Sequence, residues 1–551
     1  MAGMFLASTL VGALVYHRLI THESTSSTFF LQLATLLLVV TPVLILYKLV
    51  VYPRFVSPLR HLPKPDQGPL RQRLLKRQLS AEELDAWIKH VPNDGLIRYH
   101  GVLNKEEILI TSKDAVQECL RSKASDYNRT PLNRGVLASL TGPTSLFVST
   151  GDIHKVGRKK TAPFFQPKHM KELYPMFGEV GRILSDALVG ANANAGDEKT
   201  PGGGSAVEVA SMFQKATLDA IGHAGYGQSF RAIEDPSNEF VKTYIRAFSP
   251  ELWPRRAALL AFFDRQTVDK LLSFSKNNQG LLKGMQYVKD HGRELIRQRQ
   301  QDVEKDSEKS PLGNDMLDIS LKAGVFSNDE LVDIFTTFLL GGHETSASSL
   351  TWTIFHLSQD KDLQRRLRSE IRENVRPPSS APITAETLDN LPLLNGVLKE
   401  SLRLYPIIRT LRREVSAKKG TTLLGQYVPF GTLISIPIWS INRDQSRWGS
   451  DAQEFKPERW IEDPAHGGAG DAWDEMTFSQ GTRHCIGEGF ARSELLVLLA
   501  VLVGRLEFEF VGTGRTQSSL ETDPKKHGVR TTVVSRIAGG LWVNVREVDG
   551  W

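Results

Sequence analysis

Cys485 lies in a glycine-bracketed segment, Gly481 to Gly487, whose residue types suit a metal-bound thiolate. Glycines on both sides of the cysteine allow a tight loop, which brings backbone N–H groups close to the sulfur. Arg483 adds a cation two residues away, and the N-terminus of the helix predicted after Gly487 favours negative charge there. A thiolate in this setting could serve as a metal ligand or as a nucleophile. Cys119, in a helical context, is instead predicted to be a small buried hydrophobic residue.

Glu344 and Thr345 supply a carboxylate and a hydroxyl in the middle of a long predicted helix. This helix begins with the capping box Ser327–Glu330 and continues through at least His356. The pair Gly341–Gly342 costs roughly 1 kcal/mol per glycine relative to alanine, so it needs a reason. We expect a groove and a local distortion that holds water, with Glu344 and Thr345 delivering protons. The alternative is a glycine pair for helix packing and a threonine bonded to its own helix.

Two further segments carry charges at a suggestive spacing. Glu400 and Arg403 are three residues apart, which puts both side chains on one face of a helix. Alone, such a pair is most often a surface salt bridge. A third charge, Arg459, lies in the separate segment Phe455–Trp460.

Around the cysteine, the chain resembles the cytochrome P450 superfamily. The haem-binding pattern of that family, Phe-x-x-Gly-x-Arg-x-Cys-x-Gly, is matched at Phe478, Gly481, Arg483, Cys485 and Gly487. At about one in twenty per position, the number of chance matches expected in the chain is on the order of 10⁻⁴. The resemblance covers about residues 63 to 545. It implies a mainly α fold with a small β region, and haem b bound by the Cys485 thiolate, a ligand that favours O–O cleavage.

The resemblance also implies roles for the other charged residues. Glu400, Arg403 and Arg459 would form a buried structural triad, and Glu344 and Thr345 would belong to the oxygen-activating helix. The haem propionates would be bound by four residues: His154, Arg158, Arg413 and Arg483. His154 stands where most relatives have tryptophan. A second departure, Asn442 in place of a common histidine, carries no functional interpretation.

The implied activity is monooxygenation, the insertion of one oxygen atom from O2 into a small molecule. No Gly-x-Gly-x-x-Gly fingerprint occurs in a βαβ context, so electrons must come from a separate protein. The resemblance implies an NADPH-dependent diflavin reductase, with cytochrome b5 as a further donor. Five basic residues could form a docking face for this reductase, or they could simply form a solvated surface: Arg158, Lys159, Lys160, Lys168 and Lys171. Two rivals remain: a haem-thiolate isomerase or dehydratase, and a non-enzymatic haem sensor.

Composition limits the alternatives. The 551 residues are 40% hydrophobic and 24% charged, which is typical of a globular protein. The net charge of +6 is too small to indicate a nucleic-acid binder. Two cysteines exclude a disulfide framework and indicate a reducing compartment. We predict one catalytic domain over residues 71–551, with short strands within 96–110 and 423–436 and a flexible insertion at 191–205.

The N-terminus is predicted to anchor the chain in a membrane. Residues 28–47 form an uncharged apolar run of 20 residues, long enough for a transmembrane helix. Eight Lys and Arg against one Asp follow between Lys48 and Arg77, which predicts a cytosolic domain on the endoplasmic reticulum. Residues 1–16 are a second span, an interfacial helix or part of a signal sequence. The anchor would occupy residues 1–52, and the proline-rich segment 53–70 would be a non-helical hinge.

The predicted substrate is lipophilic. Trp253–Phe263 is an apolar stretch that suits a loop in the membrane interface. Four segments that the resemblance places around the pocket mix aliphatic residues with Ser and Thr: 135–147, 336–340, 407–411 and 529–537. Arg409 would bind a substrate carboxylate or serve the structure. We expect a terpenoid, alkaloid or polyketide intermediate, because the chain resembles fungal secondary-metabolism members of the family.

Overall fold

The computed structural model describes residues 40, 42–43, 46–75, 79–101, 104–194, 206–247, 265–305, 315–515, 520–531 and 534–551. These residues form two compact units. The first contains the described residues up to Cys119 together with Glu414–Ile436, and the second contains Leu120–Arg413 and Pro437–Trp551. All candidate site residues lie in the second unit. The division does not follow the boundary predicted at residue 70, because early strands pair with late ones.

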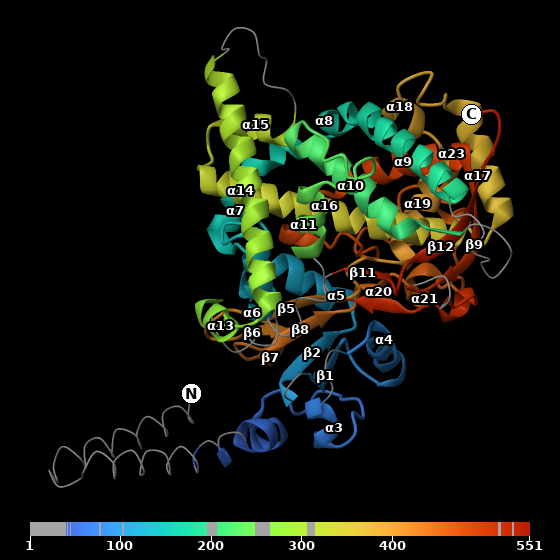
Figure 1. The fold of residues 1–551 in the computed structure, drawn as a ribbon. Coiled ribbons are helices and arrows are strands. Elements are labelled where there is room, and N and C mark those ends of the chain that lie inside the picture. Colours follow the sequence, from blue (N-terminus) through green and yellow to red (C-terminus); the bar gives the residue numbers. More distant parts are fainter. Residues whose placement is uncertain are drawn as a thin grey trace. The chain divides into compact units, whose positions relative to one another are not determined.

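The first unit is organised around short strands (Figure 1). Strand β1 (Leu96–His100) pairs antiparallel with β2 (Glu106–Ile110), which pairs in parallel with β8 (Leu433–Ile436). Strands β6 (Thr421–Leu423) and β7 (Gln426–Val428) form a hairpin. Both predicted β segments are therefore confirmed. The helices of this unit are short: α3 (Leu70–Leu75), α4 (Ala81–His90), α5 (Lys113–Gln117) and η3 (Glu118–Ser122), whose last three residues belong to the second unit.

The predicted hinge at 53–70 is wrong at its start. Helix η1 (Tyr47–Val56) is a π-helix that includes Pro53. In a π-helix each amide bonds the carbonyl five residues back, as the Ser57 amide does with the Tyr52 carbonyl at 2.8 Å. Pro53 has no backbone N–H, so the helix lacks only the one hydrogen bond that this N–H would donate. The Pro53 carbonyl accepts a hydrogen bond from Arg98 Nη2 at 2.7 Å.

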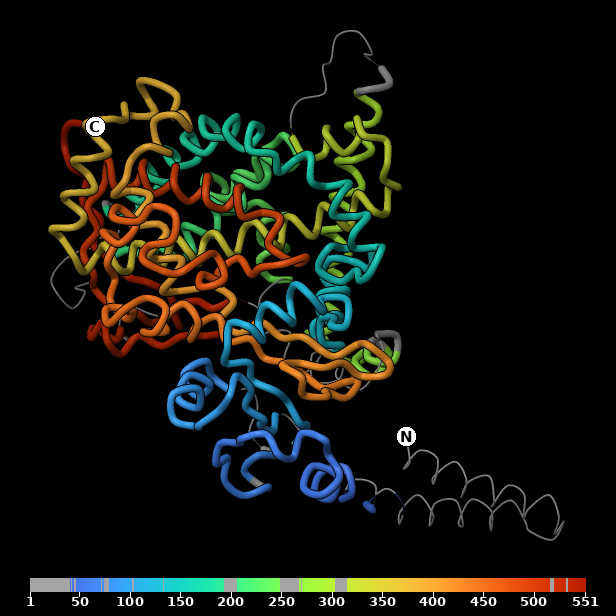
Figure 2. The backbone as a smooth tube through the Cα atoms, turned by 180° about the vertical axis from the view of Figure 1, so that it is seen from behind, coloured from blue at the N-terminus to red at the C-terminus, as the bar shows by residue number. Residues whose placement is uncertain are grey.

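Helices dominate the second unit, and α16 (Asn328–Leu357) runs through its middle beside α10, as both views show (Figures 1 and 2). Ser327 Oγ accepts a hydrogen bond from the Glu330 amide, and the Glu330 carboxylate accepts one from the Ser327 amide, which confirms the predicted capping box. Most side chains of α16 are buried, so it forms the central element of the core.

The remaining helices surround α16 or follow it in the chain. They are α6 (Pro131–Thr141), α7 (Gly151–Thr161), η5 (Ala162–Phe165), α8 (Pro167–Glu172), α9 (Tyr174–Asn194), α10 (Val209–Tyr226), α11 (Glu239–Ala247), α13 (Arg265–Leu271), α14 (Lys276–Lys305), α15 (Met316–Ala323), α17 (Lys361–Asn374), α18 (Ala385–Leu388), α19 (Pro392–Leu404), α20 (Ile438–Ile441), α21 (Gln445–Trp448), α22 (Arg459–Glu462), η7 (Gly481–Arg483) and α23 (Glu488–Arg505).

Small sheets complete this unit. Strand β12 (Leu541–Glu547) pairs antiparallel with both β4 (Ala206–Glu208) and β9 (Leu506–Thr513). Strands β10 (Val529–Thr531) and β11 (Ser535–Ile537) form a second antiparallel pair. A large apolar core joins helices α9, α10, α16, α17, α19 and α23. The expectation of a mainly α fold with a small β region is confirmed.

Four predicted segments lie wholly or partly outside the described residues. Helix α9 extends to Asn194, so the insertion predicted at 191–205 begins as helix, and residues 195–205 lie outside the described residues. The run 253–263 also lies outside them. The span predicted at 28–47 and the alternative at 1–16 lie outside as well, apart from residues 40, 42, 43, 46 and 47. Within the described part of the chain, no helix has the length and apolarity needed to cross a membrane.

Candidate active site

The loop before Cys485 is held by its own backbone. The Cys485 amide donates a hydrogen bond to the Phe478 carbonyl at 2.9 Å. Gly481 has a φ of +78°, and a Cβ there would stand 2.1 Å from the Leu120 carbonyl oxygen. Only glycine fits that close approach with that backbone conformation. Helix α23 begins directly after the loop, with Gly487 at its N-cap. The tight turn predicted from the glycines is therefore present.

The Cys485 side chain is exposed, although burial is the largest cause of a rise in the pKa of its thiol. The Gly487 amide donates a hydrogen bond to the sulfur, which opposes the rise in pKa, as do Arg158 and Arg129. The thiolate therefore has a backbone donor and two cations nearby, but the protein alone does not lower its pKa.

Four guanidinium groups and one imidazole gather near this loop, close enough to lower one another's pKa values. The pKa of Arg129 is lowered to about 9, mainly by burial and in part by Arg413 and Arg483. Burial lowers the pKa of Arg483 to about 10, with Arg413 and Arg158 adding to the effect. We call Arg129, Arg158, Arg413 and Arg483 the guanidinium cluster. Their mutual repulsion indicates a site for an anion.

His154 on α7 belongs to the same surroundings. It is buried, and burial lowers its pKa to about 4, with Arg483, Arg158 and Arg129 contributing. The ring is therefore neutral near pH 7 and has one N–H to donate.

The polar atoms of this site fit a haem with two propionates. Arg483 Nη2 donates to the Ser149 carbonyl at 2.9 Å, while its Nη1 is buried with no hydrogen-bond partner among the described residues. Arg129 Nε and Ser149 Oγ are also buried with no hydrogen-bond partner among the described residues. Buried donors of this kind are normally satisfied. Two carboxylates and an iron atom above Cys485 would satisfy both the donors and the thiolate.

On α16, Thr345 and Glu344 are both engaged. Thr345 Oγ1 donates to the Gly341 carbonyl at 2.7 Å. Glu344 is buried and forms an ion pair with Arg536 of β11. Burial raises the pKa of Glu344, and Arg536 opposes that rise. The helix is continuous here, so the expected local distortion is absent; the bond from Thr345 instead fits the alternative interpretation.

Each of the two glycines of α16 leaves room for a different neighbouring side chain. A Cβ on Gly342 would stand 2.9 Å from Ile221 Cδ1, so this glycine lets α10 pack closely. A Cβ on Gly341 would stand 3.0 Å from Phe147 Cζ. Gly342 therefore serves helix packing, as the alternative interpretation held, whereas Gly341 admits an aromatic ring from the segment before α7.

Hydrogen bonds hold that segment against α16. Asp333 accepts hydrogen bonds from the amide and hydroxyl of Thr144, at 3.0 and 2.7 Å. Thr337 Oγ1 donates to Ser145 Oγ at 2.8 Å. On the other side, the Ser535 amide donates to the Ile407 carbonyl at 2.9 Å. Parts of all four segments predicted around the pocket therefore lie together in the second unit.

The predicted triad is assembled and fully buried. Glu400 accepts hydrogen bonds from Arg403 Nε and Nη2 at 2.8 and 2.7 Å and from Arg459 Nε at 3.0 Å. The Lys456 amide and Trp460 Nε1 also donate to it, each at 3.0 Å. Glu400 and Arg403 are 0% exposed and Arg459 is 5% exposed. This carboxylate thus joins α19 to α22 and the segment before it.

The remaining basic residues that the sequence analysis singled out have several different surroundings. Arg158 Nη1 donates to the His484 carbonyl at 2.6 Å, so this residue turns toward the cysteine loop. Lys160 lies 3.5 Å from Glu330, whereas Lys159, Lys168 and Lys171 are exposed. Arg409 is buried over the Trp439 ring at 3.7 Å, which supports its structural alternative.

Sequence reasoning missed Arg129 and Arg536, and it gave no role to Asn442. Arg129 lies between β3 (Tyr127–Asn128) and α6, in the segment Asn128-Arg129-Thr130, which has the pattern of an N-glycosylation site. Asn442 Nδ2 donates to the Arg403 carbonyl and to Thr477 Oγ1, and its Oδ1 accepts from the Met476 amide. Asn442 therefore ties α19 to the segment before the cysteine loop. No local pattern marks Arg129 or Arg536, because their partners are distant in sequence.

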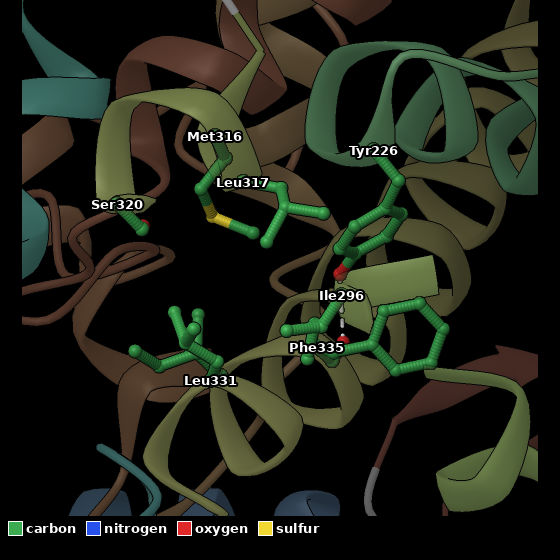
Figure 3. Close-up of a pocket in the computed structure, with 8 residues that line it drawn as sticks. Tyr226, Ile296, Met316, Leu317, Ser320, Leu331 and Phe335 are labelled. Atoms are coloured by element: carbon green, nitrogen blue, oxygen red, sulfur yellow. Dashed lines mark hydrogen bonds between the residues drawn. The ribbon is translucent and has the colours of Figure 1, made fainter. Parts of the chain in front are cut away.

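One small cavity lies elsewhere in the second unit (Figure 3). Tyr226, Met316, Leu331 and Phe335 are among its lining residues, and the Tyr226 hydroxyl donates to the Phe335 carbonyl at 2.7 Å. Its lining is apolar apart from the Ser320 and Tyr226 hydroxyls. It contains no charged or nucleophilic side chain and is a packing defect of the core.

Comparison with known proteins gives a consistent result. The sequence profile of the family described as Cytochrome P450 matches residues 75–532. The chain is 32% identical over 536 residues to the cytochrome P450 monooxygenase sphH of Aspergillus fumigatus, covering 94% of each chain. It is 32% identical over 527 residues to FSL4 of Gibberella zeae, covering 92% of this chain and 91% of the relative. It is also 32% identical to FUM15 of Gibberella moniliformis, covering 91% and 90%.

Proposed function

Since the chain belongs to the cytochrome P450 family and is a cytochrome P450 monooxygenase, we propose that it binds haem b through Cys485 and oxidises a lipophilic small molecule. The observation that carries this proposal is the Cys485 thiol, which has an amide donor from Gly487 and lies within reach of the guanidinium cluster. When bound, haem would supply the activation of O2, and thiolate ligation favours O–O cleavage.

The chain's own residues would then hold the haem in place, exclude water and deliver protons. Arg129, Arg158, Arg413 and Arg483 would bind the propionates, and neutral His154 would donate one further hydrogen bond. The turn at 144–147, fixed to α16, would keep Phe147 against Gly341 and exclude water there. The Thr345 hydroxyl would exchange its bond with the Gly341 carbonyl for a bond to a water or to oxygen, and would pass a proton.

Thr345→Ala is expected to retain haem and substrate binding but to lower product yield per NADPH by roughly 10²-fold, the lower end of the usual contribution of a proton-transfer group. Loss of the hydroxyl removes the proton path while leaving the α16 backbone bonded. Product and NADPH consumption measured together give the yield. Thr351→Ala is a matched control, because Thr351 is a buried threonine of α16 that likewise donates to its own helix, at 2.7 Å. Equal yields in both variants would place the proton path elsewhere.

We propose a terpenoid, alkaloid or polyketide intermediate as the substrate. Support comes from the aliphatic and hydroxyl-bearing segments assembled around α16, and from the fungal origin of the relatives compared above. The test is a screen of sterols, fatty acids and polycyclic terpenoids for substrate-induced shifts of the haem spectrum, followed by turnover. A response confined to fatty acids, with product formed only from them, would contradict this class.

The proposed electron donor is an NADPH-dependent reductase, with Lys159, Lys168 and Lys171 as exposed cations for its acidic surface. Cytochrome b5 is a second proposed donor. Charge reversal of these lysines would raise the reductase concentration needed for half-maximal turnover, and added salt would reduce the difference.

We further propose that the domain is cytosolic on the endoplasmic reticulum membrane, because cations follow the apolar run 28–47. A glycosylation reporter fused to the C-terminus is expected to remain unmodified in microsomes. The native sequon at Asn128 is expected to remain unmodified too. Sensitivity of either site to a glycosidase would reverse the assigned orientation. A reporter fused to the N-terminus would separate one span from two.

A further inference from the structure

Glu494 of α23 is a buried carboxyl group for which the catalytic scheme above has no use. It is 0% exposed, and neither of its side-chain oxygens has a hydrogen-bond partner among the described residues. An ionised carboxylate in such a position would cost far more than a neutral acid, because no polar group of the described residues is bonded to it to compensate its charge.

The neighbour of Glu494 is Ser346 of α16, the residue directly after Thr345. Ser346 is 1% exposed, and its Oγ also lacks a partner at hydrogen-bond geometry. Burial raises the pKa of Glu494 to about 8, and the Ser346 hydroxyl opposes that rise, so the two groups are close enough to interact. Three buried polar atoms thus face one another where α23 crosses α16.

Among the described residues, no hydrogen bond or ion pair joins a charged side chain to Glu494. Helices α8, α9, α16, α17, α18 and α19 and strand β9 pack against α23. Arg368 of α17 donates to the carbonyls of Val503 and Leu506, Glu400 binds Arg403, and Glu344 pairs with Arg536. His169 of α8 and His356 of α16 each have a buried Nε2 without a hydrogen-bond partner, and burial lowers the pKa of His356 to about 3.

We propose that Glu494 keeps its proton in the folded enzyme and forms, with Ser346, a neutral hydrogen-bonded pair that positions the Thr345 turn of α16. A protonated carboxyl donates to the serine hydroxyl directly or through one bridging water. Glu494 is therefore a positioning residue, which acts on the reacting groups through α16. The protonation is independent of the proposed function, whereas the effect on Thr345 rests on it.

Infrared difference spectroscopy of the haem-loaded enzyme at pH 7 tests the protonation. Subtracting the Glu494→Gln spectrum from the native spectrum should reveal a protonated-carboxyl band that shifts in heavy water. Glu373→Gln, which changes an exposed carboxylate of α17, should instead reveal carboxylate bands. Carboxylate bands in the Glu494→Gln difference would overturn the proposal. Ser346→Ala should retain the protonated-carboxyl band but shift it, because a donor–acceptor contact is lost; an unshifted band would overturn the pairing.

A pH series supplies a second measurement. A proton held up to about pH 8 in the folded state, but released near the ordinary glutamate pKa on unfolding, makes folding less favourable as pH rises between these values. The unfolding equilibrium constant of the native enzyme should therefore rise by up to tenfold per pH unit relative to Glu494→Gln across this range. Parallel pH profiles would contradict the proposal.

Product yield tests the positioning role. Glu494→Gln, which mimics the neutral acid, should preserve the yield of product per NADPH. Glu494→Leu should lower it severalfold while leaving the carbon monoxide spectrum of the haem unchanged. Equal yields in the Gln and Leu variants would show that Glu494 does not position Thr345. That result would leave both the infrared band and the monooxygenase assignment intact.

Discussion

Cys485→Ala is expected to reduce product formation to background and to abolish the strongly red-shifted Soret band of the reduced, carbon monoxide-treated protein. In the proposed site the Cys485 thiolate would be the ligand whose electron donation favours O–O cleavage, and alanine offers none. We do not expect the second cysteine to substitute, because Cys119 is buried, with 1% of its surface exposed. Spectra of reduced protein with carbon monoxide, together with product assays, measure both losses.

Two further variants serve as controls for this experiment. Cys119→Ala should keep both the shifted band and the activity, which controls for the loss of a thiol. Cys485→His should still bind haem through a neutral nitrogen ligand but without the shifted band, which separates loss of the thiolate from failure to fold. A shifted band that survives in Cys485→His would refute the ligand assignment.

Glu400→Ala is expected to have the largest effect on stability, a loss of roughly 3–5 kcal/mol in the free energy of unfolding. The substitution leaves Arg403 and Arg459 buried without their shared carboxylate and removes the acceptor of five hydrogen bonds. Since domains are typically stable by only about 5–15 kcal/mol, we expect little folded protein at growth temperature. The urea midpoint of a purified sample and the yield of haem-loaded protein both measure this.

Glu458→Ala provides the matched control. Glu458 precedes α22 and lies 2.8 Å from Arg366, but both side chains of this pair are substantially exposed. Exposed pairs contribute about 0–1 kcal/mol. Equal losses in the two variants would show that burial of the Glu400 triad does not determine its contribution.

The sequence predicted the parts of the site that are encoded locally. The cysteine loop was predictable because its glycines, its aromatic residue and the following helix are consecutive in the chain. The capping box at Ser327 and the strands near residues 96 and 433 were predictable for the same reason. The pairing of Glu400 with Arg459 needed the family pattern, because spacing alone cannot show that two distant segments meet.

The rest depended on contacts that no local pattern encodes. Arg129 joins the guanidinium cluster, and Arg536 pairs with Glu344, only after folding brings distant segments together. The reason for Gly342 was Ile221, a residue more than a hundred positions earlier. Pro53 was expected to stop a helix, but a wider helix and a buried arginine accommodate it. Long-range packing overrode local propensity in each of these cases.

The guanidinium cluster also bears on how the protein matures. Like charges held together in a buried site repel one another until anions arrive, so the cofactor-free chain gains stability from whatever neutralises them. Haem capture would then complete folding around α7 and the cysteine loop. Inorganic phosphate, as a simpler anion than haem, should therefore slow the digestion of the cofactor-free chain by a protease.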